Sequence, residues 1–239
     1  MAMMLVLQPL AAQFAHISHD ARRGAMGGVF LLDTTRRVEL AYRQDYMLAG
    51  MADKRAAVVL PDGRIGAVVA EYNHHGNMTY HEQQASAGYM LRVGEWLRVG
   101  VLGRWMNIGV DDAWYESHQW LGADAMAVAN VERTEMLLSV GTRPYDDVRP
   151  WRAMAQVAYR PSTEWLAAVA IETDDCLRLR CGMEYIYEEM ILFRAGMSTG
   201  PMQVGFGAGV RYGSMRLDIG AETHSSLGVS PCISVAICF

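Results

Sequence analysis

The sequence predicts an all-β protein, a transmembrane antiparallel β-barrel of about 14 strands with a short N-terminal segment in the lumen or beneath it. Three observations predict this class. The last strand is apolar along one face and ends on an aromatic residue. Alternation of period two runs from about residue 36 to the end of the chain, and the charges fall on one side of it. No uninterrupted apolar run reaches the ~18 residues of a membrane-spanning helix.

The C-terminal stretch from Pro231 to Phe239 is the most informative part of the sequence. Four apolar residues share one face of this extended strand: Ile233, Val235, Ile237 and Phe239. The opposite face carries only small or weakly polar side chains. In a soluble domain a bare apolar edge of this kind is an aggregation site. In an outer-membrane barrel the same strand closes the ring, and its terminal aromatic lies at the membrane interface.

Earlier segments alternate in the same way over roughly ten residues each, the length that a tilted strand needs to cross a bilayer. From Met202 to Tyr212, for example, apolar side chains alternate with glycines and polar residues. Turn sequences such as Pro61-Asp-Gly63 separate the segments. We expect strands near residues 37–47, 52–60, 64–73, 78–92, 96–108, 118–127, 133–141, 151–160, 164–172, 176–187, 190–198, 202–212, 215–224 and 230–239.

The charged residues indicate which environment each face meets. Burial in a dry core costs several kcal/mol for each unpaired arginine, and six arginines lie in the alternating segments: Arg152, Arg160, Arg178, Arg194, Arg211 and Arg216. The apolar faces therefore meet lipid or another apolar layer. A soluble antiparallel sandwich gives the same alternation. Aromatic residues at the expected strand ends favour the membrane barrel: Trp151, Tyr159, Trp165, Tyr185, Tyr187 and Tyr212.

The sequence divides into three parts. Residues 1–12 are similar to the apolar region of a secretory signal, although the usual positive start is missing, and a frayed apolar N-terminus is the alternative. Residues 13–35 form an N-terminal segment that either plugs the lumen or lies in the periplasm. Residues 36–239 form the barrel.

The C-terminal half also resembles a known family. The matching stretches, in family order, are Cys181-Gly-Met-Glu-Tyr185, Phe193-Arg-Ala-Gly196, Gly205-Phe-Gly-Ala-Gly209 with Leu217-Asp218, and His224-Ser-Ser-Leu-Gly228. They are similar to the PorV/PorQ-like outer-membrane proteins of the Bacteroidota, within the FadL superfamily of fourteen-stranded barrels. The resemblance implies a barrel of the bacterial outer membrane. The family's Asn-Pro-Ala stretch is absent, and Tyr42-Arg-Gln-Asp-Tyr46 stands in its place.

Residue patterns for catalysis and cofactor binding are weak. The glycines from Gly205 to Gly209 lie in a strand and open no helix, so they do not form a phosphate loop. They either let the sheet curve or let a plug approach. Glu116 and Ser117 precede His118, but strand neighbours point to opposite faces, so no catalytic triad follows. We expect no enzymatic activity and no cofactor.

Metal and nucleic-acid sites are not predicted either. His74, His75 and His81 flank one expected turn, where solvated histidines are far commoner than ligands. The cysteines at 176, 181, 232 and 238 lack CxxC spacing, which argues against zinc. Apolar residues make up 51% of the chain, charged residues 20%, and the net charge is -5, so neither a disordered nor a nucleic-acid-binding chain is expected.

Inward-facing charges of both signs recur on the late strands. Adjacent ladders of opposite sign would interlock as cross-strand pairs and fill the lumen, although they could instead line a polar path for a substrate. The residues of this expected lumen charge network are Glu172, Arg178, Arg180, Glu184, Arg194, Arg211, Arg216, Asp218 and Glu222.

Two functions remain open. The resemblance to PorV, the filled lumen and the lack of chemistry favour a non-catalytic barrel subunit of a machine, either type IX secretion-like or associated with barrel assembly. Its partners would be membrane lipid and other outer-membrane or periplasmic subunits. The alternative is a FadL-like transporter of small hydrophobic molecules, which superfamily membership and the 17 methionines favour.

Overall fold

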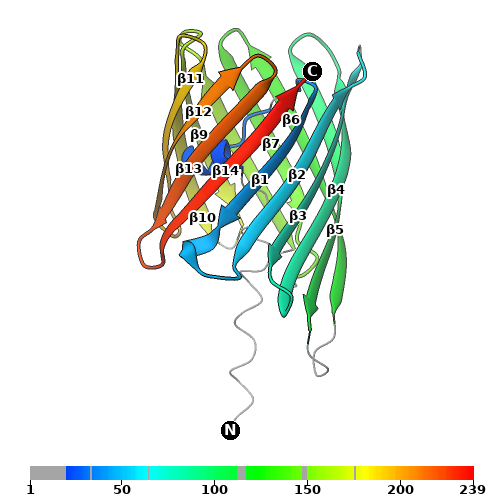
Figure 1. Cartoon of the computed structure of the whole chain (residues 1–239). Helices are drawn as coiled ribbons and strands as arrows, with labels where there is room; N and C mark the ends of the chain where they lie inside the picture. Colours follow the sequence, from blue (N-terminus) through cyan, green and yellow to red (C-terminus); the bar gives the residue numbers. More distant parts are fainter. Residues whose placement is uncertain (1–19, 33, 64, 112–116, 147–149, 175) are drawn as a thin grey trace.

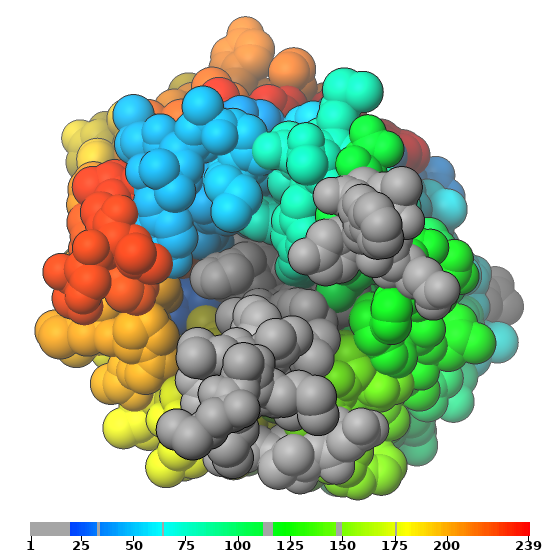
Figure 2. Space-filling view, turned by 90° about the horizontal axis from the view of Figure 1, so that it is seen from below, coloured from blue at the N-terminus to red at the C-terminus, as the bar shows by residue number. Residues whose placement is uncertain are grey.

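The computed structural model describes residues 20–32, 34–63, 65–111, 117–146, 150–174 and 176–239. Within them, fourteen antiparallel strands form one closed barrel, in which sequence neighbours pair and the last strand pairs with the first. The tilted strands enclose the barrel axis in Figure 1, and Figure 2 shows the strands following one another around that axis in sequence order. The predicted all-β barrel of fourteen strands is confirmed.

The strand bounds agree with the expected ranges to within a few residues. They are β1 (Arg37–Gln44), β2 (Ala52–Pro61), β3 (Gly66–Gly76), β4 (Tyr80–Arg92), β5 (Leu97–Val110), β6 (His118–Val131), β7 (Thr134–Thr142), β8 (Trp151–Tyr159), β9 (Trp165–Thr173), β10 (Leu177–Tyr187), β11 (Ile191–Ser198), β12 (Gln203–Tyr212), β13 (Met215–His224) and β14 (Gly228–Cys238).

Three strands end three or four residues from the expected position. β3 continues to Gly76 instead of ending at residue 73, because its pairing with β4 extends to that residue. β1 ends at Gln44 instead of residue 47, because Asp45–Met47 form the 3-10 turn η2, in which Tyr46 has φ 51° and Met47 has φ 58°. These backbone angles interrupt an extended strand. β6 continues to Val131, four residues beyond the expected end, because its pairing with β5 extends to Ala129 and its pairing with β7 to Val131.

The outer surface of the barrel is apolar. Large exposed hydrophobic side chains occur on every strand from β1 to β14. On β14, which pairs with β1 from Cys232 to Cys238, Ile233 and Ile237 are exposed, Val235 is half-buried, and Phe239 follows with 64% of its surface exposed. Most of the strand-end aromatics are exposed as well: Trp151, Tyr159, Trp165, Tyr187 and Tyr212. An apolar ring with aromatic borders is the surface that a bilayer requires.

The two ends of the barrel differ in their connections. At the end that carries the C-terminus in Figure 1, the turns are short, for example Glu132-Arg133 and Gly213-Ser214. The opposite end carries the longer connections, 45–51, 111–117 and 143–150. Outer-membrane barrels have short periplasmic turns and longer extracellular loops. The end with the C-terminus is therefore assigned to the periplasm.

The N-terminal segment begins, where the structure describes it, with a short helix inside the barrel. Helix α1 (Ala21–Ala25) contacts strands β11 to β14 from the lumen side (Figure 1). The expected signal remnant, residues 1–12, lies outside the described residues, as does Glu116 of the Glu-Ser-His stretch. All four cysteines are free. In the described part of the chain, no helix is long and apolar enough to span a bilayer.

Candidate functional site

Glycines of the barrel wall make room for α1. A Cβ atom on Gly196 of β11 would lie 2.2 Å from the carbonyl carbon of Met26, and one on Gly205 of β12 would lie 2.2 Å from the carbonyl oxygen of Gly24. On Gly182 of β10 it would lie 2.4 Å from the oxygen of Met26. Real Cβ atoms do not approach other atoms so closely, so the wall needs glycine at these positions. The sequence left two roles open for the glycines from Gly205 to Gly209, curvature of the sheet or approach of a plug. An added Cβ would meet α1 at Gly205 and Gly207, but Asp218 of the wall at Gly209.

A continuous series of ion pairs lies beside this glycine wall. Along the series each charge contacts one of opposite sign; half of these residues are buried and the other half are partly buried. We call it the ion-pair belt; its members are Arg22, Glu184, Arg194, Asp218, Arg216, Glu39, Arg37, Arg55, Glu71 and Asp20.

Three short contacts of the belt join β10, β11 and β13. Arg194 Nε lies 2.6 Å from Glu184 Oε2, and Arg194 Nη1 lies 2.7 Å from Asp218 Oδ1. Arg216 Nε lies 2.8 Å from Asp218 Oδ2. Asp218 is 0% exposed. Buried charges of this kind need partners, because desolvation of an unpaired one is very costly.

Helix α1 completes the belt at both ends. Arg22 donates to Glu184, with Nη2 2.7 Å from Oε1, and Asp20 Oδ2 lies 3.6 Å from Arg55 Nη1 on β2. Asp20 also caps the helix, since its Oδ1 accepts a hydrogen bond from the backbone N–H of Arg23 at 2.7 Å. Burial alone would raise the pKa of Asp20, but the attraction of Arg55 and the hydrogen bond from Arg23 outweigh burial and lower it to about 2. Asp20 is therefore ionised at neutral pH.

The predicted lumen residues fall into three groups. Glu184, Arg194, Arg216 and Asp218 belong to the belt. Two further pairs lie apart from it: Glu172 with Arg180, and Glu222 with Arg43.

The last two predicted residues lie elsewhere. Arg178 donates to the carbonyl of Gly200 at 2.8 Å, near the end of the β11–β12 turn. Arg211 is exposed at the end of β12, opposite Arg216 in the register, and does not lie inside the network as expected. Arg211 is the last inward position of β12, so its side chain extends beyond the packed lumen.

Sequence reasoning missed six of the ten belt residues. Glu39, Arg55 and Glu71 lie on the first three strands, whereas the network was sought on the late strands only. Their signal was present, because a closed barrel places β1 beside β14 and continues the inward ladder across the closure. Asp20 and Arg22 precede the barrel, and the sequence alone gives no sign of where such a segment docks.

The other side of the lumen, from β4 to β9, is mixed: buried apolar side chains alternate with buried polar ones such as Glu82, Gln84 and Gln156. The outer surface is exposed, so buried apolar side chains on these strands face inward; Met106 and Val128 are examples. Two apolar clusters mark the ends of this side. At the loop end, Met106 and Ile108 pack with Tyr80, Trp120 and Tyr145. Toward the periplasmic end, Leu166, Ala168 and Ala158 pack with three residues of the N-terminal segment, Met26, Val29 and Leu31.

A group of ion pairs lies on this side between the clusters. Asp124 of β6 pairs with Arg104 of β5, with Arg104 Nε 2.7 Å from Oδ2, and with Arg152 of β8 at 3.1 Å. Val128 and Leu137 lie opposite each other across β6 and β7, on the periplasmic side of this group. The wall from Tyr80 to Leu166 therefore carries apolar clusters at its two ends, with buried polar and charged side chains between them.

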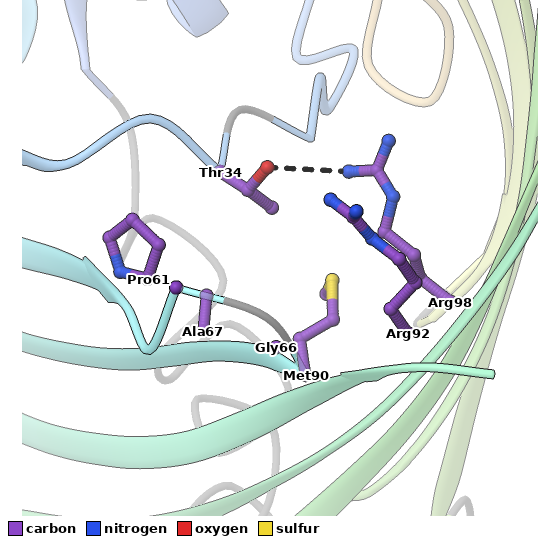
Figure 3. A pocket seen from close by; sticks show the side chains of 8 residues that line it. Thr34, Pro61, Gly66, Ala67, Met90, Arg92 and Arg98 are labelled. Atoms are coloured by element: carbon purple, nitrogen blue, oxygen red, sulfur yellow. Dashed lines mark hydrogen bonds between the residues drawn. The ribbon is translucent and has the colours of Figure 1, made fainter. Parts of the chain in front are cut away.

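A small polar pocket opens at the periplasmic end. It has a volume of ≈ 110 Å³ and is lined by the β2–β3 turn, Met90 and two arginines, Arg92 and Arg98. Figure 3 shows both guanidinium groups beside Thr34, whose Oγ1 accepts from Arg98 Nη1 at 3.5 Å. The pocket thus joins the N-terminal segment, as it leaves the lumen, to the ends of β4 and β5.

Comparison with solved structures shows a shared fold. The toluene transporter TbuX of Ralstonia pickettii superposes with a TM-score of 0.69 at 10% identity, covering 93% of this chain and 98% of that one. The toluene transporter TodX of Pseudomonas putida gives 0.68 at 10% identity, covering 93% and 98%. A variant of the Rh. blastica porin gives 0.51 at 7% identity, covering 86% and 99%.

No protein-family model and no curated protein matches the sequence. The structural superpositions alone show the similarity: the chain shares its fold with hydrocarbon channels of the FadL type. The reported matches are channels and porins. A closed barrel with an apolar outer ring is the architecture of an outer-membrane protein, so the predicted location is confirmed.

Proposed function

We propose that the protein is a channel for small, largely apolar molecules across the outer membrane, with α1 occupying its lumen in the state described. The observation that carries the proposal is the division of the lumen wall. Strands β10 to β14 and β1 to β3 hold α1 through glycines and ion pairs, whereas the wall from β4 to β9 carries the two apolar clusters, separated by buried polar side chains. An apolar solute would pass along the second side.

Both ends of the lumen wall from β4 to β9 suit the passage of a small apolar molecule. The cluster around Met106 and Trp120 gives an apolar, aromatic entrance at the loop end. The cluster of Leu166 with Met26 and Val29 lies where the N-terminal segment meets the opposite wall. Ligand sites in proteins are mostly apolar with a few polar groups, and Asp124 with its two arginines supplies such groups midway. The fold shared with two toluene transporters supports the same substrate class.

Uptake of radiolabelled toluene tests the proposal. Cells of a host bacterium that lacks its own hydrocarbon channels would express the protein, and uptake would be normalised to the folded barrel on heat-modifiable gels. We expect the wild type to raise uptake several-fold and Leu137→Asn to remove most of the gain, because Leu137 is buried on the apolar side. The matched control is Leu138→Asn, since Leu138 is 57% exposed on the outer surface. Equal uptake by wild type and by cells without the barrel would contradict the proposal.

The second candidate is a subunit of a secretion or barrel-assembly machine. The feature that favours it is a hollow of ≈ 570 Å³ on the outer surface of β4 to β7, lined by small and apolar side chains such as Gly100, Ala125 and Leu138. Apolar patches of this kind suit contact with another membrane protein as well as with lipid. A pull-down of the tagged barrel from its native outer membrane in mild detergent distinguishes the channel from the machine subunit. Stoichiometric recovery of a machine component favours the subunit, and recovery of the barrel alone favours the channel.

A further inference from the structure

A compact group of ligand-type side chains lies at the loop end of the barrel, away from α1 and the ion-pair belt. Asp45 comes from η2, Asp53 from the start of β2 and His75 from the end of β3. One candidate ligand atom from each lies within 4.8 Å of the other two. The three residues are 3%, 9% and 8% exposed, respectively. His75 is therefore not the solvated turn residue that the sequence suggested, and it lies in a buried polar site.

The spacing of these atoms is close to that of a metal site. Asp53 and His75 are direct cross-strand partners, and His75 Nδ1 lies 2.6 Å from Asp53 Oδ1 and 3.5 Å from Asp45 Oδ2. Ligands about 2.0–2.2 Å from a tetrahedral zinc ion are about 3.4 Å from one another. Opening the first contact by less than about 1 Å would admit the ion. Because the residues sit at the end of the barrel and retain slight exposure, an ion can reach them from solvent.

The charges around the site also suit a divalent cation. Arg43 lies 2.7 Å from Asp45 Oδ1, but its charge is matched by Glu222, with Nη1 3.1 Å from Oε2. When the imidazole is neutral, as a metal ligand must be, the two carboxylates leave two negative charges. Glu82 of β4, buried opposite His75 in the register, adds a further negative charge. A net negative group of this kind is costly to bury without a cation.

An unsatisfied ligand atom is the second, independent sign of a site. Asp53 Oδ2 is buried and has no hydrogen-bond partner among the residues that the structure describes. A buried acceptor without a partner costs about 1–3 kcal/mol, so such atoms call for an explanation. Arg43, in contact with Asp45, would orient that carboxylate as an outer partner orients a metal ligand.

We propose that Asp45, Asp53 and His75 bind one divalent transition-metal cation, of which Zn²⁺ fits best. Imidazole nitrogen disfavours Ca²⁺ and Mg²⁺, which prefer oxygen ligands. Three protein ligands leave a fourth position for water. The ion would join the β1–β2 connection to β3 and so hold η2 in place at the mouth of the barrel. This site is independent of the proposed channel activity.

Metal analysis of the refolded full chain tests the site. The barrel in detergent would be treated with a chelator, dialysed against Zn²⁺ at pH 7.5, and its zinc content measured. We expect one Zn²⁺ per wild-type chain and loss of that ion in Asp53→Asn and in His75→Gln. His74→Gln is the control, because His74 neighbours His75 but stacks on His81 with ring centroids 6.0 Å apart, outside the three-residue group.

A melting experiment distinguishes a variant that has lost the zinc site from one that has failed to fold. Variants that migrate as folded barrels on heat-modifiable gels would be heated with and without Zn²⁺, and we expect the ion to raise the melting temperature of wild type and His74→Gln only. Two results would overturn the proposal. Absence of zinc from the wild type would mean that His75 and the two aspartates form an ion-pair group only. Loss of zinc in His74→Gln with retention in His75→Gln would assign the ion to the His74–His81 pair.

Discussion

Around the barrel axis, strands β10 to β14 and β1 to β3 turn glycines and charges inward, whereas β4 to β9 turn Met106, Val128 and Leu166 inward. The first side holds α1 through directional contacts, Arg22 to Glu184 and Asp20 to Arg55. The second side contacts the N-terminal segment through the side chains of Met26, Val29 and Leu31. Gln156 of β8 adds hydrogen bonds with the backbone N–H and carbonyl of Phe30. Ion pairs require a fixed geometry, while apolar contact is non-directional.

This difference indicates how a filled lumen can still conduct. An apolar solute that separates Val29 from Leu166 replaces one apolar surface with another, at little cost in free energy. Separation of Arg22 from Glu184 would leave a charge buried in the wall. The weaker interface is therefore the apolar one, and the following variants test whether the two sides differ in this way.

Loss of one charge in the ion-pair belt should have the largest effect. Asp218→Asn removes the partner of both Arg194 and Arg216, and Arg194 is buried. Removal of one member of a buried pair costs about 3–5 kcal/mol. We expect a loss of this order in the free energy of unfolding, measured by urea titration in lipid vesicles. The control is Glu132→Gln, since Glu132 is exposed in the β6–β7 turn. Equal midpoints for the two variants would mean that the belt is hydrated.

Closing the space for α1 should have the next largest effect. A methyl group on Gly196 would meet the backbone of Met26 at 2.2 Å, so Gly196→Ala forces the helix off the wall. Overpacking costs about 1–3 kcal/mol. We expect trypsin to cleave after Arg22 or Arg23 in this variant while the barrel stays folded. Gly103→Ala is the matched control, because the nearest atom to its added Cβ is 3.9 Å away. Protection of both variants from trypsin would show that α1 tolerates the methyl group.

Shortening a buried side chain on the apolar side should lower the free energy of unfolding by less. This loss should also depend less on which residue is shortened, because apolar contact is non-directional. Val29→Ala removes two buried carbon atoms from the cluster with Leu166, a loss of about 1–2 kcal/mol. We expect toluene uptake to rise in this variant, because the contact that a solute must displace is weaker. A fall in uptake would mean that Val29 lines the path and does not obstruct it.

The sequence predicted the wall of this barrel far better than its contents. Period two sets each strand, and the strand bounds follow from it because one face meets lipid. The 3-10 turn at Asp45–Met47 was missed, since alternation continues through residues that adopt positive φ. The ion-pair partners of Glu184 were harder still to predict from the sequence. Arg194 is its neighbour across β10 and β11, but Arg22 lies 162 residues away in a segment without alternation.

The three-residue metal candidate was missed for the same physical reason. His75 was noted, and the spacing of Asp53 and His75 across a hairpin is implied by the strand register. Asp45 joins them only because η2 folds back over the first residues of β14. There the N–H of Tyr46 donates to Ser230 Oγ at 2.9 Å. A turn fixed by tertiary contact leaves little trace in a sequence pattern.

Removal of the Asp20 charge should have the smallest effect on the free energy of unfolding among the charge and packing variants, and this effect should depend on pH. Asn caps a helix about as well as Asp, so Asp20→Asn loses mainly the attraction of Arg55, 3.6 Å away, about 2 kcal/mol at most. The folded pKa of Asp20 is lowered from 3.8 to about 2, so its contribution is present above pH 4 and disappears as the pH falls toward 2. Urea midpoints of wild type and Asp20→Asn, compared from pH 6 to pH 2, should therefore converge only in acid. A difference that stays constant over this range would show that the contact does not depend on charge, and the polar side would then hold α1 by shape alone.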